Sequence, residues 1–490
     1  MVRRPGLSKS RLTAFEQCPK RLWLQIHRPD LAETDERAEA RFAAGHEVGA
    51  VACSLVPQGV MIEAEPDLAA ALDRTRELIA TAPDRPLFEA AFEHDGVLVR
   101  CDILEPDGQG GYAMAEVKSS TAAKPYHIAD VATQIWVARG AGVAVSAAVV
   151  RHIDNRFVLG RQGEYRGLFA DADVLAEAEP IARDRGRVVA AARRCLAGPQ
   201  PDIAPGAQCS DPFACEFASH CGSVLPKGPD WPVTILPRGG GRAWLDQGIE
   251  DLLAVDPKGL PNATQRRIHH ATRTGQPFHD IEAARIAMAG WAFPRTWLDF
   301  ETIGFAVPRW IGTRPYQNLP FQFSAHVEDA DGEVAHHEFL SLDGADPRRA
   351  CAEALLAAVP TAGAIIAYSA SFERGVIRDL AQVFPDLSAP LAAMAERVVD
   401  LLPVARETWY HRDQRGSWSI KAVLPTIAPD LNYSNLEVGD GQAAQGAYLE
   451  ATAKDTDPAR RAQIASALSA YCARDTWAMI AVARRLAGLS

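Results

Sequence analysis

The chain has 490 residues and a formal net charge of −11, from 51 Lys and Arg against 62 Asp and Glu. At about 150 residues per domain this length predicts two to four domains, and 48% hydrophobic residues exclude a disordered or fibrous chain. We expect a cytoplasmic protein with no membrane partner, because no apolar stretch follows the charged start and no apolar run is long enough to span a bilayer. Nine cysteines, an odd number, fit a reducing compartment where clustered cysteines bind metal more often than they form disulfides.

The composition divides the chain into three regions. Residues 1–221 alternate helical and strand-like segments. Residues 222–290 begin with a linker rich in Gly and Pro and continue as a small helical connector. Residues 291–490 begin with a strand-like segment and end in a long helix. Mixed strands and helices throughout predict α/β or α+β domains.

The first candidate site lies on a predicted hairpin. Residues 97–104 and 112–118 have strand patterns, and the turn residues between them favour antiparallel pairing. Because strand side chains alternate between faces, Glu116 and Lys118 point the same way, and Asp102 on the neighbouring strand can join them. Two carboxylates can hold Mg²⁺, and a lysine beside them can position a water and stabilise phosphate charge. A solvated Glu-x-Lys pair explains the triplet alone equally well.

Two other residues extend this site. His46 lies in an Ala-rich helical segment, and a histidine upstream of a metal-binding hairpin can be a further ligand. Gln134 lies in a predicted helix over residues 129–139, from which it can contact the site or a nucleic-acid backbone.

The cysteines form a second pattern. Cys209, Cys215 and Cys221 are separated by five residues each, and Cys18 is the fourth candidate ligand. Four thiolates suit a [4Fe–4S] cluster or a structural Zn²⁺. Zinc modules usually close locally through CxxC knuckles, so the distant Cys18 favours the cluster, with zinc as the alternative. The other five cysteines have apolar neighbours and are expected in the core: Cys53, Cys101, Cys195, Cys351 and Cys472.

Together these motifs resemble the RecB-like PD-(D/E)XK nucleases, in the iron–sulfur branch that serves CRISPR adaptation and bacterial recombination. The resemblance covers residues 1–221 and implies a restriction-endonuclease-like fold. It also implies Mg²⁺ or Mn²⁺ at His46, Asp102 and Glu116, with Lys118 catalytic and Gln134 in the active site. The Tyr of the family's Gln-x-x-x-Tyr helix is Ala138 here.

A second acidic site is predicted in residues 291–490. Asp299 and Glu301 share one face of an apolar strand, where carboxylates are costly unless they bind something. Tyr471 and Asp475, four residues apart in a helix, lie on one side of it. Glu373 follows a strand at residues 364–368. These acids can hold two metal ions about 4 Å apart for phosphodiester hydrolysis, with Tyr471 orienting the water.

This pattern resembles the DnaQ-like DEDD exonucleases of ribonuclease-H-like fold, in their tyrosine variant. The resemblance covers residues 296–486 and implies two-metal hydrolysis, usually from a 3′ end. The family's central Asp corresponds to Glu373 here, and Asp400 is a second candidate for that role. A ribonuclease-H-like domain retained for binding or scaffolding is the alternative.

The two halves together resemble a bacterial nuclease family that combines these domains through a small helical connector. We therefore expect a Mg²⁺- or Mn²⁺-dependent nuclease, a DNA exonuclease in the first place, with DNA favoured over RNA. The alternative is a catalytically drifted nucleic-acid-binding or assembly subunit of a defence or repair complex. The first 28 residues hold seven basic residues against one acidic residue, and this stripe predicts phosphate contacts. Its members are Arg3, Arg4, Lys9, Arg11, Lys20, Arg21 and Arg28, of which Lys9, Arg11, Lys20 and Arg21 are the predicted nucleic-acid-binding residues.

Overall fold

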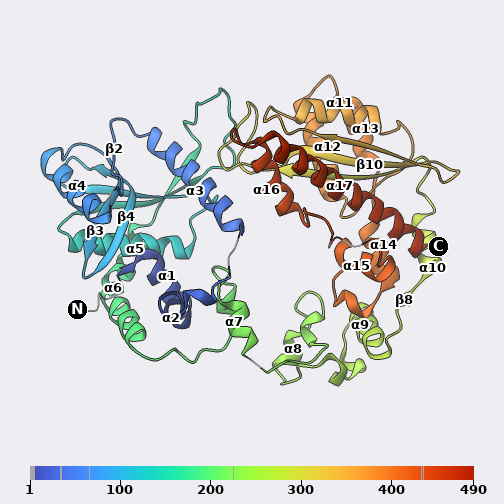
Figure 1. Ribbon diagram of the computed structural model, residues 1–490, viewed down its shortest axis with the longest axis horizontal. Helices are drawn as coiled ribbons and strands as arrows, with labels where there is room; N and C mark the ends of the chain where they lie inside the picture. The colour runs from blue at the N-terminus through green and yellow to red at the C-terminus, as the bar shows by residue number, and fades with distance from the viewer. Residues whose placement is uncertain are drawn as a thin grey trace. The chain divides into compact units, whose positions relative to one another are not determined.

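The computed structural model describes residues 6–33, 36–65, 67–224, 226–431, 433 and 435–489, so Arg3 and Arg4 of the basic stripe lie outside the described residues. The chain forms two compact units (Figure 1). Unit 1 comprises residues 1–226 and 305–316, and unit 2 comprises residues 227–304 and 317–490. Each unit combines a sheet with helices, which confirms the α/β class.

Unit 1 is built on a sheet of seven strands in the order β2-β3-β4-β5-β6-β7, with β1 paired to β4. The bounds are β1 (Leu7–Ser8), β2 (Val60–Met61), β3 (Leu87–His94), β4 (Val97–Pro106), β5 (Tyr112–Lys118), β6 (Val145–Ile153) and β7 (Phe169–Asp173). The predicted hairpin is confirmed, because β4 and β5 pair antiparallel with Leu104 opposite Met114. β6 is parallel to β5, and a parallel pair needs a crossover, which α5 (Pro125–Gly140) supplies.

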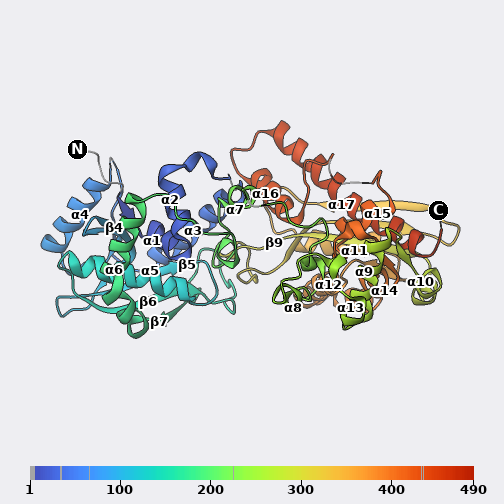
Figure 2. The same cartoon turned by 90° about the horizontal axis from the view of Figure 1, so that it is seen from below.

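Helices cover both faces of this sheet. Their bounds are α1 (Lys9–Gln17), α2 (Pro19–His27), α3 (Glu36–Ser54), α4 (Leu68–Thr81), α6 (Leu175–Ala197) and α7 (Ala218–Ser223), besides α5. Met114 of β5 packs in the main core with α5, whereas the next residue, Ala115, packs in a smaller cluster with Ala52 of α3. By the alternation of strand side chains, Glu116 and Lys118 lie on the α5 face. α5 and α6 pack side by side over this face (Figure 2).

Unit 2 is built on a sheet of five strands in the order β11-β10-β9-β12-β13. The bounds are β9 (Arg295–Ile303), β10 (Leu319–Glu328), β11 (Val334–Leu340), β12 (Ile365–Ala367) and β13 (Val398–Asp400). β9, β10 and β11 are antiparallel neighbours, while β12 runs parallel to β9 and β13 runs parallel to β12.

The two faces of the unit 2 sheet carry different helices. Those packed on or near it are α11 (Arg348–Ala358), α12 (Ser371–Val383), α13 (Ser388–Glu396), α14 (Leu401–Thr408), α15 (Ile420–Ile427), α16 (Gly441–Thr452) and α17 (Pro458–Leu486). Trp297 of β9 shares a core with α17, and the next residue, Leu298, shares a core with α11, α12 and α13. Asp299 and Glu301 therefore lie on the α17 face, because they alternate with Leu298. Figure 1 shows α17 crossing β10 on this side.

The predicted connector packs inside unit 2. Its elements are α8 (Arg242–Leu245), α9 (Ala263–Thr274), β8 (Phe278–His279) and α10 (Ile281–Met288). β8 pairs antiparallel with β14 (Trp409–Tyr410), and Ile268 of α9 belongs to the same core as Trp409. Within the described ranges, no helix is both long enough and apolar enough to cross a bilayer.

Candidate active sites in the two units

The first site, which we name the Glu116 cluster, gathers side chains from β4, β5, α1 and α5. Its members are Lys9, Asp102, Glu116, Lys118, Asp130 and Gln134. Glu116 is buried, with 1% of its surface exposed. Its Oε1 lies 2.5 Å from Lys9 Nζ and 2.8 Å from Lys118 Nζ, and its Oε2 accepts a hydrogen bond from Gln134 Nε2. The predicted shared face of Glu116 and Lys118 is confirmed, and Gln134 reaches the site.

Local structure explains how α1 and α5 supply these partners. Ser8 caps α1 by accepting a hydrogen bond from the backbone N–H of Arg11, which starts the helix at Lys9. Asp130 and Gln134 are four residues apart on α5, so they present their side chains on one side of that helix. Asp130 accepts hydrogen bonds from Lys118 Nζ at 3.0 Å and from Thr13 Oγ1 at 3.2 Å.

The lysines decide the charge of Glu116. Burial alone raises the pKa of this carboxyl, but the charges of Lys9 and Lys118 outweigh burial and hold the pKa well below its usual range. The pKa of Lys9 is in turn raised, because Glu116, Asp102 and Asp130 overcome the effect of burial. The cluster is therefore an ionised network in which a carboxylate and two ammonium groups compensate each other.

Asp102 has the opposite tendency. Burial raises its pKa and the neighbouring Glu116 charge raises it further, against the lowering influence of Lys9 and of the Val117 backbone. Its Oδ2 accepts the Val117 N–H at 2.7 Å, which ties the carboxyl to β5. Burial and the Glu116 charge thus disfavour the charged form of Asp102.

His46 does not join the cluster, contrary to the prediction. It is exposed on α3, which packs on the Ala115 face of β5, whereas Glu116 lies on the α5 face. Among the described residues, the single group of three or more potential ligands within 4.8 Å of one another lies in unit 2. Ala138, where the resemblance expects Tyr, is fully buried in the core of unit 1.

The four predicted cluster cysteines lie in one neighbourhood. Gln17, next to Cys18, donates from Nε2 to the carbonyls of Gln208 and Phe213 at 2.7 Å, which holds the 208–215 loop against the junction of α1 and α2. Burial raises the pKa of the Cys221 thiol, and Cys209 and Cys18 raise it further. Cys215 likewise has a raised pKa, through burial first and with Cys209 among the other causes.

The spacing of these thiols bears on the cofactor. A single tetrahedral Zn²⁺ with Zn–S bonds of about 2.3 Å needs thiolates about 3.8 Å apart, and no three described thiols lie within 4.8 Å of one another. An iron–sulfur cluster holds its thiolates farther apart, because each binds a different iron atom. Cys18, Cys209, Cys215 and Cys221 are the thiols that would hold either group. Of the five other cysteines, Cys101, Cys351 and Cys472 are buried as expected, and Cys53 and Cys195 are half-buried.

Four basic residues of the predicted phosphate-binding stripe have partners within unit 1. Lys9 belongs to the Glu116 cluster, and Arg11 donates to the Gly6 carbonyl. Lys20 is 8% exposed and donates to the Ile203 carbonyl. Arg21 forms an ion pair with Glu216 at 2.8 Å. These contacts arise because α1 and α2 are enclosed by the sheet and the cysteine loop, which the local charge count does not reveal.

The second site, which we name the Asp299 cluster, consists of Asp299, Glu301 and Asp475. One carboxylate oxygen of each residue lies within 4.8 Å of the others. Asp299 and Glu301 alternate along β9, and α17 brings Asp475 to the same face. Glu301 is 7% exposed and Asp475 is 9% exposed. The predicted convergence of these three acids is thus present in the structure.

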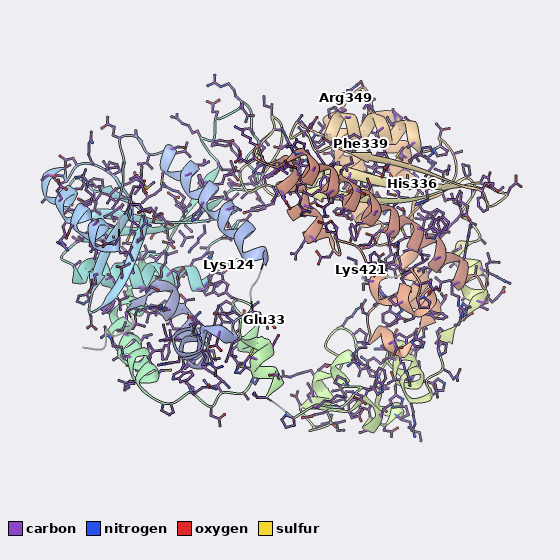
Figure 3. The ribbon with its side chains drawn as sticks, in the orientation of Figure 1. Glu33, Lys124, His336, Phe339, Arg349 and Lys421 are labelled. Atoms are coloured by element: carbon purple, nitrogen blue, oxygen red, sulfur yellow. The ribbon has the colours of Figure 1, made fainter. Side chains whose placement is uncertain are left out.

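Two tyrosines and a lysine surround the Asp299 cluster. Tyr471 lies one helical turn before Asp475, and its hydroxyl accepts a hydrogen bond from Lys421 Nζ at 3.1 Å. Tyr433 donates to Asp475 Oδ1 at 2.5 Å. Figure 3 marks Lys421 on α15, which packs against α17. Burial raises the pKa of Tyr471, and the charges of Asp475, Glu301 and Asp299 raise it further, so this hydroxyl stays protonated.

Glu373 and Asp400 have distinct roles. Glu373, in the first turn of α12, is 3% exposed, its Oε2 has no hydrogen-bond partner, and it is one of the charges that raise the pKa of Asp299. Asp400 accepts from the backbone N–H groups of Ser369 and Leu402, at 2.9 and 3.0 Å, and so caps α14. Glu373 is therefore the acid that adjoins Asp299, while Asp400 shapes the loop after β12.

The acids of this site all have raised pKa values. Burial and the charge of Asp475 raise the pKa of Glu301 to about 8, although Lys421 opposes the shift. Burial together with Asp475, Glu301 and Glu373 raises the pKa of Asp299 well above its usual range. Burial likewise raises the pKa of Glu373 to about 8. Carboxyls held in this way bind protons or cations strongly.

Sequence reasoning missed four contributors: Lys9 as a partner of Glu116, Asp130, Lys421 as a partner of Tyr471, and Tyr433. A local signal existed for Asp130, because Asp130 and Gln134 are polar residues four apart in one helix. No local signal marks Lys421 or Tyr433, which reach α17 from a distant part of the chain.

Comparisons with known proteins describe part of the chain. A family described as "Domain of unknown function (DUF2779)" matches residues 296–419, about a quarter of the sequence. No curated protein matches. A solved structure, "Crystal structure of SSO0001", is 13% identical and covers 46% of this chain and 90% of its own, with a TM-score of 0.23. The matched segment of this chain includes Asp299, Glu301, Glu373 and Asp400.

Proposed function

We propose that the protein is a metal-dependent nuclease that hydrolyses phosphodiester bonds, with the Asp299 cluster as its principal active centre. The observation that carries this proposal is the convergence of Asp299, Glu301 and Asp475 within 4.8 Å. Three carboxylates so close together, two of them buried and that of Asp299 half-buried, repel one another unless protons or cations neutralise them. The sheet supports the proposal as well, since its order β11-β10-β9-β12-β13 with antiparallel β10 is the arrangement expected of a ribonuclease-H-like domain.

The side chains present have the properties that such a reaction requires. Asp299, Glu301 and Asp475 would hold Mg²⁺ or Mn²⁺, and Glu373, with its unpartnered Oε2, would complete the donor set. Bound divalent ions would supply charge stabilisation for the attacking and leaving oxygens. Tyr471, kept protonated by its acidic neighbours, orients the attacking water through its hydroxyl. Lys421 holds that hydroxyl in place by donating to it.

The Glu116 cluster is proposed as a second centre, of PD-(D/E)XK type. Asp102 and Glu116 would bind the metal ion, Lys118 would stabilise charge on the phosphate, and Gln134 orients Glu116. The nucleic acid is proposed to be DNA rather than RNA, and hydrolysis from an end is the mode that the resemblance implies. Cys18, Cys209, Cys215 and Cys221 would hold a [4Fe–4S] cluster that joins the α1–α2 junction to the end of unit 1.

A cleavage assay tests the enzyme proposal. End-labelled single-stranded DNA, duplex DNA and RNA are incubated with Mn²⁺ or Mg²⁺ and wild type, Asp299→Asn, Lys118→Ala or the double variant. Asp299→Asn should lower the principal activity by at least about 100-fold, the scale of losing one stabilising group in a catalytic centre. Asp331→Asn, an exposed turn residue, is the matched control and should keep full activity. If wild-type protein leaves every substrate intact, the enzyme proposal is wrong.

The alternative is a nucleic-acid-binding subunit whose catalytic sites have drifted. One observation favours it for unit 1: Lys9 Nζ lies 2.5 Å from Glu116, where a metal ion would otherwise be expected. Ala138 and Glu373, the two departures from the expected motifs, point the same way. Tight binding of labelled DNA without cleavage by wild type would decide for this alternative.

The cluster proposal has its own measurement. Anaerobically purified protein should be brown, with broad visible absorbance that Cys209→Ser and Cys221→Ser abolish, and should contain about four iron atoms per chain. Cys351→Ser, at a buried cysteine outside the set, should keep the colour. Colourless protein with one zinc ion would show that the cluster assignment is wrong.

A further inference from the structure

Unit 2 contains a second cavity, of about 1080 Å³, which we name the α15 cavity. It lies between the connector, the loop after β12 and the start of α15. The residues that line it are Pro237, Arg238, Asn262, Thr264, Gln265, Tyr368, Ser369, Leu402, Arg406, Glu407, Gly416, Ser417, Trp418, Ser419 and Ile420. None of the residues assigned to the Asp299 cluster is among them.

Two elements connect the α15 cavity with the Asp299 cluster. Ser369 lines the cavity, and four residues later Glu373 adjoins Asp299. Ile420 lines the cavity, and the next residue, Lys421, donates to Tyr471. A separate cavity of about 590 Å³ is lined by Glu301 and by Phe372, which lies at the start of α12. The segment that contains Ser369 and Phe372 therefore borders both cavities.

The charged groups of the α15 cavity favour an anion. In the described part of the chain, Arg238 and Arg406 form no side-chain hydrogen bond or ion pair. Glu407 is the lining carboxylate, and it is exposed. Arg406 lies near Tyr368 in the cavity wall. Its charge lowers the pKa of Tyr368, although burial raises that pKa more strongly. Unpaired guanidinium groups bind phosphate oxygens in a planar, two-pronged geometry.

Two further observations point to a polar ligand. Gln265 is 6% exposed and lines the cavity, yet its Oε1 has no hydrogen-bond partner. A buried amide oxygen without a partner is costly, and a ligand N–H or O–H removes that cost. α15 begins in the cavity wall, and the side chain of its cap residue, Ser419, does not cap it. The N–H groups of Ile420 and Lys421, which precede the Ala422 N–H bonded to the Ser419 carbonyl, can therefore receive an anion.

We propose that the α15 cavity binds nucleotides of a single strand that flank the phosphodiester held at the Asp299 cluster. This inference rests on the proposed nuclease function and adds a substrate site made largely by the connector. The volume exceeds the needs of a lone phosphate, since cavities of about 300–1,000 Å³ take nucleotide-sized ligands. Arg238 and Arg406 contact backbone phosphates, Gln265 hydrogen-bonds a base or sugar, and the start of α15 receives a phosphate oxygen.

The test is the salt dependence of strand binding by the full-length protein without divalent metal. A fluorescently labelled phosphorothioate oligothymidylate, which resists cleavage, is titrated between about 50 and 200 mM salt. Log affinity falls as log salt rises, and each phosphate contact of a single strand adds about 0.7 to the steepness of this slope. The double variant Arg238→Gln/Arg406→Gln should lower that slope by about 1.4 and weaken binding at least about tenfold at low salt. Arg406→Lys keeps the charge and should keep most of the slope.

Arg273→Gln is the matched control, because Arg273 is exposed on α9 of the same connector and does not line the cavity. It should bind with the wild-type slope, and thermal melting should show that all variants fold. A double variant that keeps both the wild-type slope and affinity overturns the proposal, as does Arg273→Gln with an equal loss. If wild type cleaves its substrates but the double variant keeps the wild-type slope, the strand site is wrong and the nuclease function is not. If the double variant has a lowered slope but wild type cleaves nothing, the nuclease function is wrong and the strand site is not.

Discussion

The charges of the carboxylates in the two acidic clusters are neutralised in opposite ways. In unit 1, Glu116 is compensated by Lys9 and Lys118 at 2.5 and 2.8 Å, and its pKa is held low. In unit 2, Lys421 donates to Tyr471 and to the Gly439 carbonyl, and the pKa of Glu301 rises to about 8. The first cluster carries its own counter-charge, whereas the second depends on protons or cations from solution.

This difference separates two kinds of acidic site. A cluster with internal lysines is stable when empty and gains little from a cation, which has to compete with the lysines. A cluster of crowded acids is strained when ionised and gains much when a divalent ion neutralises it. We therefore expect the two units to respond differently to metal, to the loss of a lysine and to pH.

The largest expected effect is stabilisation of unit 2 by metal. Mn²⁺ at about 100 times its dissociation constant should stabilise the metal-free protein by about 2.7 kcal/mol, because it binds the folded state alone. Calorimetric unfolding with and without Mn²⁺ measures this. Asp299→Asn should abolish most of the gain, whereas Glu116→Gln and the exposed control Asp331→Asn should retain it. Equal losses in Asp299→Asn and Glu116→Gln would remove the contrast between the clusters.

The next effect is the loss of Lys9. Lys9→Met should destabilise unit 1 by about 2 kcal/mol, less than the full cost of breaking a buried ion pair, because Lys118 still contacts Glu116. Chemical denaturation measures the change in the free energy of unfolding. Lys9→Met combined with Glu116→Gln should recover part of the loss, since no uncompensated charge remains. Arg28→Gln, at an exposed ion pair with Asp30, is the control and should leave stability unchanged. If the losses of unfolding free energy in the two single variants simply add in the double variant, Lys9 and Glu116 do not compensate each other.

The smallest effect, taken over a single pH unit, is the pH dependence from Glu373. Its pKa is raised from 4.5 to about 8, so between these values the folded chain holds a proton that the unfolded chain has released. Stability of the metal-free protein therefore falls as pH rises through this window, by up to about 1.4 kcal/mol per pH unit for one proton. Glu373→Gln should flatten the dependence by that amount, and the exposed control Glu333→Gln should not. A steeper fall in Glu373→Gln would contradict the assigned pKa direction.

Local periodicity explains which parts of the sites were predictable. Glu116 and Lys118 share a face because strand side chains alternate, and Tyr471 and Asp475 share one because four residues make about one helical turn. Both relations survive folding unchanged, since they depend on backbone geometry within a single element. The convergence of Asp299, Glu301 and Asp475 was expected from the cost of carboxylates in an apolar strand and from the family resemblance, because spacing within one element does not relate β9 to α17.

Relations between distant segments were not predictable in this way. The basic stripe became a set of internal contacts, because α1 and α2 pack into unit 1 with Lys9 on Glu116 and Lys20 buried. His46 was expected at the metal site, but α3 covers the other face of β5. Residues 305–316 join unit 1 although they separate β9 from β10 of unit 2. None of these placements has a signature in local composition or periodicity.

The sequence by itself determined the α/β class, the hairpin, and the pairs of polar residues that share a strand or helix face. Local backbone geometry sets these features, and it is encoded by residues a few positions apart. Tertiary packing decided that Lys9 also reaches Glu116 and that no lysine forms an ion pair with the acids of β9 and α17 in the described part of the chain. It therefore decided their charge, since the pKa of a buried carboxyl depends on which charges the fold brings within a few ångströms.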